Sequence, residues 1–183
     1  MRWRRALALG CAALLAGAAL AQDAPPEPEF YRMQDYRAPT PATLQGARVL
    51  TDAQAHDLWN SGSAAFIDVL PQPPRPANLA ADVVWRDKPR FDIPGSLWLP
   101  DTGYGALAQT VEAYFRAGLR KASNGDPAHA LVFYCLRDCW MSWNAAKRAI
   151  AAGYSNVGWF PGGSDGWEQA GWPLEARRPE PRP

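Results

Sequence analysis

Between residues 49 and 160 the chain alternates short continuous apolar runs with longer segments whose apolar residues recur every three or four positions. A continuous run is typical of a strand that is covered on both faces of a parallel sheet. The expected strands are residues 49–50, 64–69, 97–99, 131–134 and 157–160. Strands that alternate with helices predict an α/β domain with a mainly parallel central sheet flanked by helices.

The segments between these runs carry the apolar stripes and end signals of helices. Thr51 and Gln54 form a capping box at the start of the first helix. Ser142 is placed to cap the helix after the run at 131–134, and Gly153 is placed to end that helix in a left-handed conformation. The expected helices cover roughly residues 51–62, 106–121, 142–153 and 164–170.

The first 21 residues have the composition of a secretory signal peptide. Three arginines precede an uncharged apolar run at residues 6–20, and Ala19-Leu20-Ala21 matches the small-x-small cleavage pattern. The apolar run is short and rich in alanine, so cleavage after Ala21 is favoured over an uncleaved membrane anchor. We therefore expect a periplasmic protein that has no membrane attachment once the signal peptide is removed.

The distribution of proline and of apolar residues divides the rest of the chain. Residues 22–46 form a proline-rich extension without periodicity, which is expected to be disordered except where its aromatic residues pack on the domain. The domain itself covers residues 47–175 and contains a long irregular segment at 70–92. Residues 176–183 form a C-terminal tail.

Composition and charge exclude some classes of partner. The chain has 183 residues, 48% of them hydrophobic, and a net charge of +1. Cleavage removes three arginines and leaves 16 basic residues against 18 acidic ones, so the basic field of a general nucleic-acid binder is missing. Nine tryptophans favour an aromatic-lined site. Without a heptad repeat or an obvious apolar patch, the protein is expected to be a monomer.

Cleavage also removes Cys11 and leaves Cys135 and Cys139 as the only cysteines. A disulfide between residues so close in sequence removes little entropy from the unfolded chain and so stabilises the fold only slightly. A chemical role for the two cysteines is therefore favoured over a structural crosslink. Cys135 follows a predicted strand and precedes a predicted helix, where backbone N–H groups lower a thiol pKa and stabilise a thiolate or persulfide. Arg137 would add positive charge to the same loop.

Cys139 is expected to act as the resolving thiol. It can close a disulfide with Cys135 after that residue has become a sulfenic acid, a persulfide or a mixed disulfide. Such a bond needs Cα atoms about 4.4–6.8 Å apart, which a curved loop or one helical turn provides. A buried and unreactive Cys139 is the alternative.

Five other residues are candidates for contact with a substrate. Asp68 lies near the end of the predicted strand at 64–69, where it either polarises the site or accepts hydrogen bonds from loop N–H groups. Arg86 lies in the long irregular segment and could reach the substrate. Trp140, Met141 and Ser142 follow the second cysteine directly.

An ordered set of segments resembles the rhodanese family of sulfurtransferase domains. The segments are Phe66-Ile-Asp-Val69, Ile93-Pro-Gly-Ser-Leu-Trp-Leu-Pro100, Tyr134-Cys135, Ala151-Ala-Gly-Tyr154, Gly162-Gly163, Trp167 and Gly171-Trp-Pro173. The resemblance implies a rhodanese-like fold in which Cys135 takes sulfane sulfur from a small-molecule donor and passes it to a thiol. Asp92 stands where many members have histidine, and the loop after Cys135 is longer than usual and lacks glycine. These departures disfavour ordinary thiosulfate transfer.

The segment from Phe133 to Asn144, Phe-Tyr-Cys-Leu-Arg-Asp-Cys-Trp-Met-Ser-Trp-Asn, also resembles a narrower group. This group consists of exported rhodanese-like proteins that have a CXXXCW motif and are associated with alcohol catabolism dependent on pyrroloquinoline quinone (PQQ). The resemblance implies a periplasmic partner of PQQ-dependent alcohol oxidation.

Two other classes of function stay open. The first is a non-catalytic scaffold that holds a partner protein or PQQ, with Trp140, Trp143 and basic loop residues as an aromatic and cationic rim. The second is Cu(I) handling by the two thiolates, for which His56 and His129 are poorly placed as further ligands. Sulfur chemistry at the cysteines requires no cofactor, and no metal site is predicted.

Overall fold

The structure of the protein is a computed structural model that describes residues 24–86 and 88–182. The expected signal peptide, including Cys11, lies outside these residues. Within the described ranges, no helix is both long enough and apolar enough to cross a membrane.

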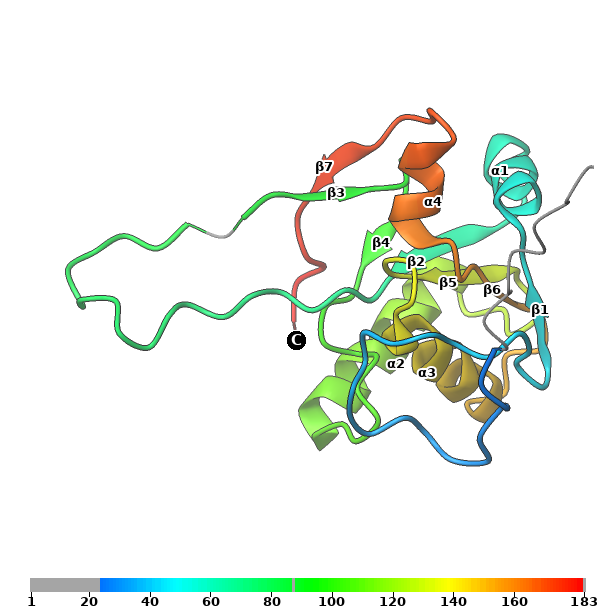
Figure 1. Cartoon of the computed structure of the whole chain (residues 1–183), viewed down its shortest axis with the longest axis horizontal. Coiled ribbons are helices and arrows are strands. Elements are labelled where there is room, and N and C mark those ends of the chain that lie inside the picture. The colour runs from blue at the N-terminus through cyan, green and yellow to red at the C-terminus, as the bar shows by residue number, and fades with distance from the viewer. Residues whose placement is uncertain (1–23, 87, 183) are drawn as a thin grey trace, which may run out of the picture.

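A parallel sheet of five strands forms the centre of the molecule (Figure 1) and confirms the predicted α/β class. Its strands, in spatial order, are β1 (Ala47–Val49), β6 (Val157–Trp159), β5 (Leu131–Tyr134), β2 (Ala65–Asp68) and β4 (Leu97–Trp98). Asp68 at the end of β2 pairs with Trp98 of β4 and with Tyr134 of β5. The carboxyl ends of these three strands therefore finish at one edge of the sheet.

Alternate residues of β5 face two hydrophobic cores. Leu131 and Phe133 pack in the core beneath α2 and α3, whereas Val132 and Tyr134 pack in the core beneath α1 and α4. Figure 1 shows these two pairs of helices on opposite faces of the sheet. Because both faces of β5 are covered, the strand reads as a continuous apolar run. The helices are α1 (Asp52–Asn60), α2 (Gln109–Ser123), α3 (Trp140–Ala151) and α4 (Gly163–Gln169).

The helix ends follow the predicted signals in part. The capping box at Thr51 is present, and Gly153 has a φ of 95° just beyond the end of α3. The prediction that Ser142 caps α3 is wrong, because the helix begins two residues earlier and Cys139 is its N-cap. Ser142 lies in the first turn, where its hydroxyl accepts a hydrogen bond from the indole N–H of Trp159 at 3.0 Å.

A second, antiparallel sheet pairs β3 (Arg90–Asp92) with β7 (Glu175–Arg177). The segment 70–92 was expected to be irregular throughout, which is wrong for its last three residues. β7 crosses the expected boundary between the domain and the tail. Strands of three residues leave almost no periodic signal, because their pairing depends on a partner that is distant in sequence.

The proline-rich extension packs against α3, so the expectation of a largely disordered segment is wrong for its described part. We refer to residues 28–44 as the strap. The Asn144 side chain accepts a hydrogen bond from the N–H of Arg32 and donates one to its carbonyl, both at 2.9 Å. The indole N–H of Trp143 donates to the carbonyl of Thr43 at 3.1 Å. Side chains of α3, rather than a strand ladder, thus hold the strap in place.

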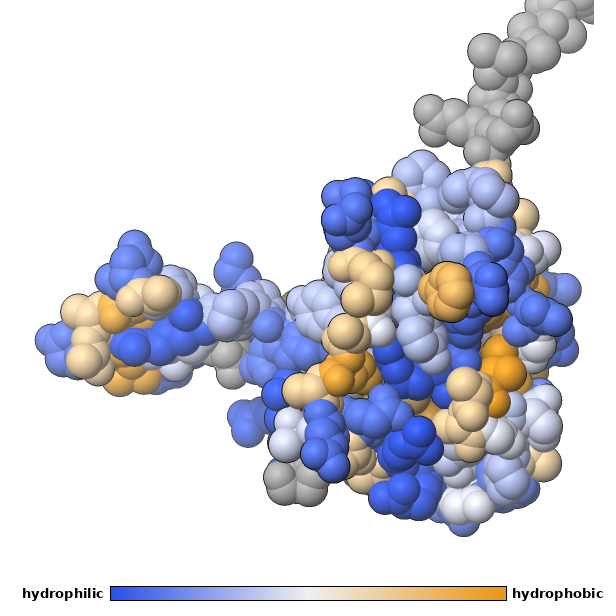
Figure 2. Space-filling model, turned by 90° about the horizontal axis from the view of Figure 1, so that it is seen from below, coloured by the Kyte–Doolittle hydropathy of each residue, from blue (hydrophilic) through white to orange (hydrophobic). Residues whose placement is uncertain are grey.

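Residues 70–89, which we refer to as the arm, project from the body beside β3 (Figure 1). The described part of the arm contains no helix or strand. Val83 and Val84 are exposed near its tip, and apolar side chains gather there in Figure 2. The base of the arm begins at Leu70, directly above the carboxyl end of β2, so only the base takes part in the site described next.

Candidate functional site

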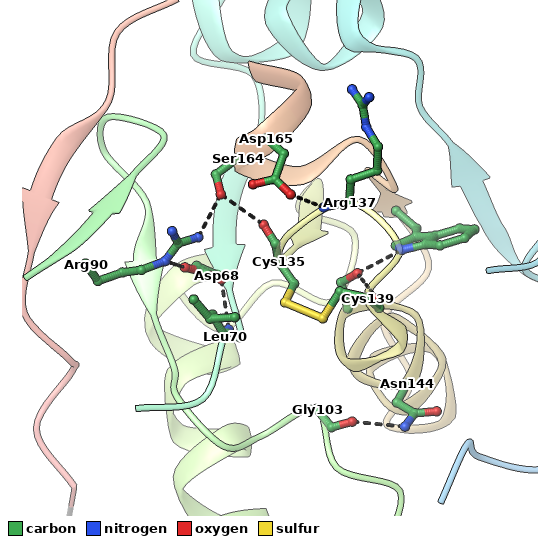
Figure 3. The surroundings of a disulfide bond; sticks show 12 residues. Asp68, Leu70, Arg90, Gly103, Cys135, Arg137, Cys139, Asn144, Ser164 and Asp165 are labelled. Carbon is green, nitrogen blue, oxygen red and sulfur yellow. Dashed lines mark hydrogen bonds and ion pairs between the residues drawn. A yellow bond between two sulfur atoms is a disulfide. The ribbon is translucent and has the colours of Figure 1, made fainter. Parts of the chain in front are cut away.

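The two cysteines lie in the loop that connects strand β5 to helix α3. Cys135 is the first residue after β5, and Cys139 is the N-cap of α3. Their sulfur atoms form a disulfide across a Cα–Cα distance of 6.2 Å (Figure 3). The predicted reach between the two residues is therefore confirmed. The pair sits at the sheet edge where ligands bind in open parallel folds.

Both cysteines are buried in this oxidised form. Cys135 is 0% exposed and Cys139 is 3% exposed. The expected thiolate or persulfide on Cys135 is therefore absent from this state, because the sulfur is covalently bonded to Cys139 and buried. A thiolate can exist here only after the disulfide has been reduced.

The loop N–H groups expected to cradle the Cys135 sulfur are partly occupied elsewhere. The N–H of Arg137 donates to Asp165 Oδ2 at 3.1 Å, and the N–H of Trp140 donates to the carbonyl of Tyr36 in the strap at 2.9 Å. The guanidinium of Arg137 is exposed and points away from the disulfide in Figure 3. In the oxidised form, Arg137 thus contributes its backbone to the loop and not its charge to the sulfur.

Asp68 anchors a buried network that ends on Cys135. Its Oδ1 accepts the N–H of Leu70 at 2.9 Å, and its Oδ2 accepts Nε of Arg90 at 2.6 Å. Arg90 also donates to the hydroxyl of Ser164 at 3.0 Å. Ser164 donates to the Cys135 carbonyl, through its hydroxyl at 3.3 Å and its N–H at 3.0 Å (Figure 3). Asp68 thus does accept a loop N–H, as one of the two predicted roles requires.

Sequence reasoning missed Ser164, counted Arg90 only among the basic residues of the irregular segment, and noted Asp92 only as a departure from histidine. Asp92 is buried with Oδ1 3.0 Å from Nε of Arg90. Burial, together with the nearby Asp68 carboxylate, raises the pKa of Asp92 to about 9, so this carboxyl is protonated at neutral pH. Burial likewise raises the pKa of the Tyr134 hydroxyl well above its ordinary value. Arg90 and Asp92 reach the site because β3 pairs with β7, and no local sequence pattern predicts that pairing.

The residues expected to contact a substrate after Cys139 lie inside the protein. Trp140, Met141 and Ser142 are buried, as is Trp143. Arg32 covers the ring of Trp140 at 5.2 Å, and Lys147 covers the ring of Trp143 at 4.8 Å. The expected open aromatic rim is therefore wrong, because the strap closes over it. These rings present no open face to a planar quinone such as PQQ.

Arg86 lies on the arm, at a distance from the disulfide loop. It lines a hollow between the arm and the C-terminal tail, together with Arg178 and Pro179. Of the predicted site residues, Asp68 reaches the disulfide loop through the network on Cys135 and Arg137 through its backbone N–H. The hydroxyl of Ser142 donates to the Cys139 carbonyl at 3.1 Å.

The residues considered for Cu(I) are arranged differently from a copper site. The two sulfur atoms are bonded to each other. His56 stacks on Trp172 at 4.2 Å, with Trp167 at 5.5 Å, on the side of the sheet that carries α1. In the described part of the chain, no three side chains of histidine, cysteine, aspartate or glutamate are grouped closely enough to hold a metal ion.

No family model and no curated protein matches the chain. Solved structures similar to it include a thiosulfate sulfurtransferase from Pseudomonas aeruginosa, with 18% identity over 73% of this chain and 21% of the other, and a TM-score of 0.49. Another is a polysulfide-sulfur transferase homodimer from Wolinella succinogenes, with 19% identity over 72% and 80% of the two chains and a TM-score of 0.44. A third is an Escherichia coli 3-mercaptopyruvate sulfotransferase of "Rhodanese" fold, with 19% identity over 67% and 43%, and a TM-score of 0.39.

Proposed function

We propose that this protein is a rhodanese-like sulfurtransferase or thiol-redox protein that works through Cys135 and Cys139. The observation that carries the proposal is their disulfide, which joins the end of β5 to the start of α3. A bond that closes so small a ring contributes little to stability. Its place at the ligand-binding edge of a parallel sheet therefore favours a chemical role.

The reaction starts when a thiol reduces the disulfide. The Cys135 thiolate attacks the sulfane sulfur of a donor, a sulfur–sulfur bond in the donor breaks, and the remainder of the donor leaves as an anion. The product is a persulfide on Cys135. An acceptor thiolate then takes the outer sulfur, or the Cys139 thiolate attacks the inner sulfur, expels hydrosulfide and restores the disulfide.

The network from Asp68 supports this chemistry by fixing the loop. Ser164 holds the Cys135 carbonyl by two hydrogen bonds, and Arg90 holds Ser164. The carbonyl therefore stays fixed while the sulfur changes partners. The N-cap position of Cys139 puts its sulfur near the positive end of the α3 dipole, which favours the thiolate form after reduction.

The proposed place of this activity is the periplasm, where it would serve PQQ-dependent alcohol oxidation. The signal-peptide pattern of residues 1–21 supports export, and a disulfide persists in an oxidising compartment. The link to alcohol oxidation rests on the CXXXCW segment alone. The proposed partners are a small-molecule sulfur donor or a protein thiol, and the protein is proposed to act as a monomer.

A non-catalytic scaffold is the second candidate. It is favoured by the burial of both cysteines and by the strap that covers the start of α3. A scaffold differs from an enzyme in one measurable way, since its cysteines would exchange no sulfur during repeated cycles.

Intact mass after reduction and incubation with a polysulfide donor tests the proposal. The wild-type protein should gain sulfur and lose it again when an acceptor thiol is added. Cys139→Ser should keep the added sulfur longer, because the resolving thiol is absent. Cys135→Ser should take up none. Full turnover by Cys135→Ser would contradict the assignment, and an inert wild-type protein would favour the scaffold.

A further inference from the structure

A pocket of about 810 Å³ lies beside the disulfide loop. Its wall comes from the base of the arm, β3, the loop after β5 and the start of α4, so it lies at the carboxyl ends of β2 and β5. Small-molecule sites in proteins commonly have volumes of about 300–1,000 Å³. The volume therefore fits an organic molecule and exceeds what an inorganic sulfur anion fills.

Most of the pocket wall is apolar. It includes Leu70, Pro71, Phe91, Trp98, Leu136 and Leu174. Leu136 follows Cys135 directly, and both Leu136 and Leu70 pack against the core that contains the two cysteines. Neither cysteine lines the pocket itself, so Leu136, the neighbour of Cys135 in the chain, is the part of the disulfide loop that forms its wall.

Charged side chains also line the pocket. Arg37 is one of them, and it pairs through its backbone with Cys139 in an isolated β-bridge. Lys88 and Arg90 are two further cations, of which Arg90 is paired with Asp68. Of the two carboxylates that line the pocket, Asp165 already accepts the N–H of Arg137, and Glu168 is the other. Cations that line a pocket attract an incoming thiolate.

We propose that this pocket binds the organic body of an apolar small-molecule thiol, which is the reductant of the Cys135–Cys139 disulfide. The thiolate attacks one cysteine sulfur, the disulfide breaks, and the other cysteine leaves as a thiolate. A second thiol molecule attacks the mixed disulfide, so that two thiols become one external disulfide and both cysteines are reduced. The inference rests on the proposed function only in taking the disulfide as the reacting group.

Two thiols of similar thiol pKa, benzyl mercaptan and 2-mercaptoethanol, provide the test. The rate of reduction of the oxidised protein is measured for each thiol by intact mass after acid quenching. Each rate is divided by the rate of the same thiol with oxidised glutathione, which removes the intrinsic reactivity. The wild-type protein should then prefer benzyl mercaptan by about tenfold or more, because an apolar pocket discriminates by the surface it covers.

Phe91→Ser is the pocket variant, since Phe91 is 51% exposed and its loss leaves both cores intact. It should lower the preference to within about threefold of unity. Val84→Ser is the matched control, because Val84 is an apolar arm residue outside the pocket wall and is 78% exposed. The control should keep the wild-type preference.

A wild-type preference near unity would overturn the pocket assignment, as would equal preferences in the two variants. Both outcomes leave the proposed function standing, because the disulfide has been reduced in each case. A disulfide that neither thiol reduces would instead remove the proposed function together with the inference.

Discussion

Arg90 connects the end of β2 to the start of α4 at the candidate site. Its guanidinium contacts Asp68 beneath the base of the arm and Ser164 at the start of α4. Ser164 in turn bonds the Cys135 carbonyl. A change at any of these residues is therefore expected to reach the disulfide through the backbone of the loop.

Ser164→Ala should lower the free energy of unfolding by about 1–2 kcal/mol, because it leaves the Arg90 guanidinium with one partner fewer in a buried position. It should also change the rate of disulfide reduction by a small thiol. Urea unfolding and a reduction time course measure the two effects. The exposed Ser63→Ala serves as control and should stay within about 0.5 kcal/mol of wild type. Equal stability of the two variants would show that the network contributes nothing.

Asp92 gives the protein a predictable dependence on pH. Its pKa is about 9 in the folded protein, mainly through burial, against 3.8 ordinarily. At a pH between these two pKa values, Asp92 is protonated in the folded state and ionised in the unfolded state. The free energy of unfolding therefore falls as pH rises through this window, by at most about 1.4 kcal/mol per pH unit.

Asp92→Asn removes this titrating group, so the free energy of unfolding should fall less steeply with pH than in the wild type. Relative to the wild type, the variant should therefore become more stable between about pH 5 and pH 8. Urea unfolding at several pH values measures the difference. Asp57 lies on the exposed side of α1, and for Asp57→Asn the free energy of unfolding should depend on pH as it does in the wild type. Parallel curves for Asp92→Asn as well would contradict a protonated Asp92.

At the scale of single residues, the sequence predicts those whose neighbours are local. The reach between Cys135 and Cys139 and the N–H that Asp68 accepts follow from spacing along one strand or loop. Arg90 and Ser164 meet only because distant segments are brought together. Arg90 lies in a strand of three residues and Ser164 in a helix of seven residues, and elements this short carry too little periodicity to predict which polar side chains are buried.

At the scale of elements, α3 both supports the disulfide and holds the strap. Its apolar face was predicted from helical spacing, and the positions of the strands followed from the same patterning. The strap was not predicted, since its contacts are made by the polar atoms of Asn144 and by tryptophan N–H groups, which the sequence presents as ordinary polar or aromatic positions.

Asn144→Ala should detach part of the strap. The variant loses hydrogen bonds to the N–H and carbonyl of Arg32 and to the carbonyl of Gly103, which together should cost about 3 kcal/mol. The N–H of Trp140 would then exchange faster with solvent if the strap lifts from it. Gln34→Ala alters an exposed strap side chain and should leave both stability and exchange unchanged. Unaltered exchange in Asn144→Ala would mean that the strap is held elsewhere.

At the scale of the whole molecule, the arm is separate from both cores. No residue between 71 and 89 belongs to either buried cluster in the described chain. Its length and its run of prolines predict an irregular segment, which is what most of it is. The base of the arm therefore forms part of the pocket wall, whereas its tip packs against neither core.

Replacing residues 76–84 by a short glycine–serine linker should change the free energy of unfolding by less than about 1 kcal/mol, because the tip buries no core side chain. Leu119→Ala, in the core beneath α2, should in contrast cost about 2–5 kcal/mol. Thermal or urea unfolding compares the two. A large loss on replacing the tip would mean that it packs against the body.

The strap also constrains the order in which the chain can be assembled. It precedes its binding surface on α3 by about a hundred residues, so its contacts with that helix can form only once the helix exists. The segment that is made early must therefore wait for the later half of the protein before these contacts can form. Before the strap docks, the two cysteines at the start of α3 lack its cover, so the docking of the strap ends the interval in which oxidants and folding catalysts reach them most easily.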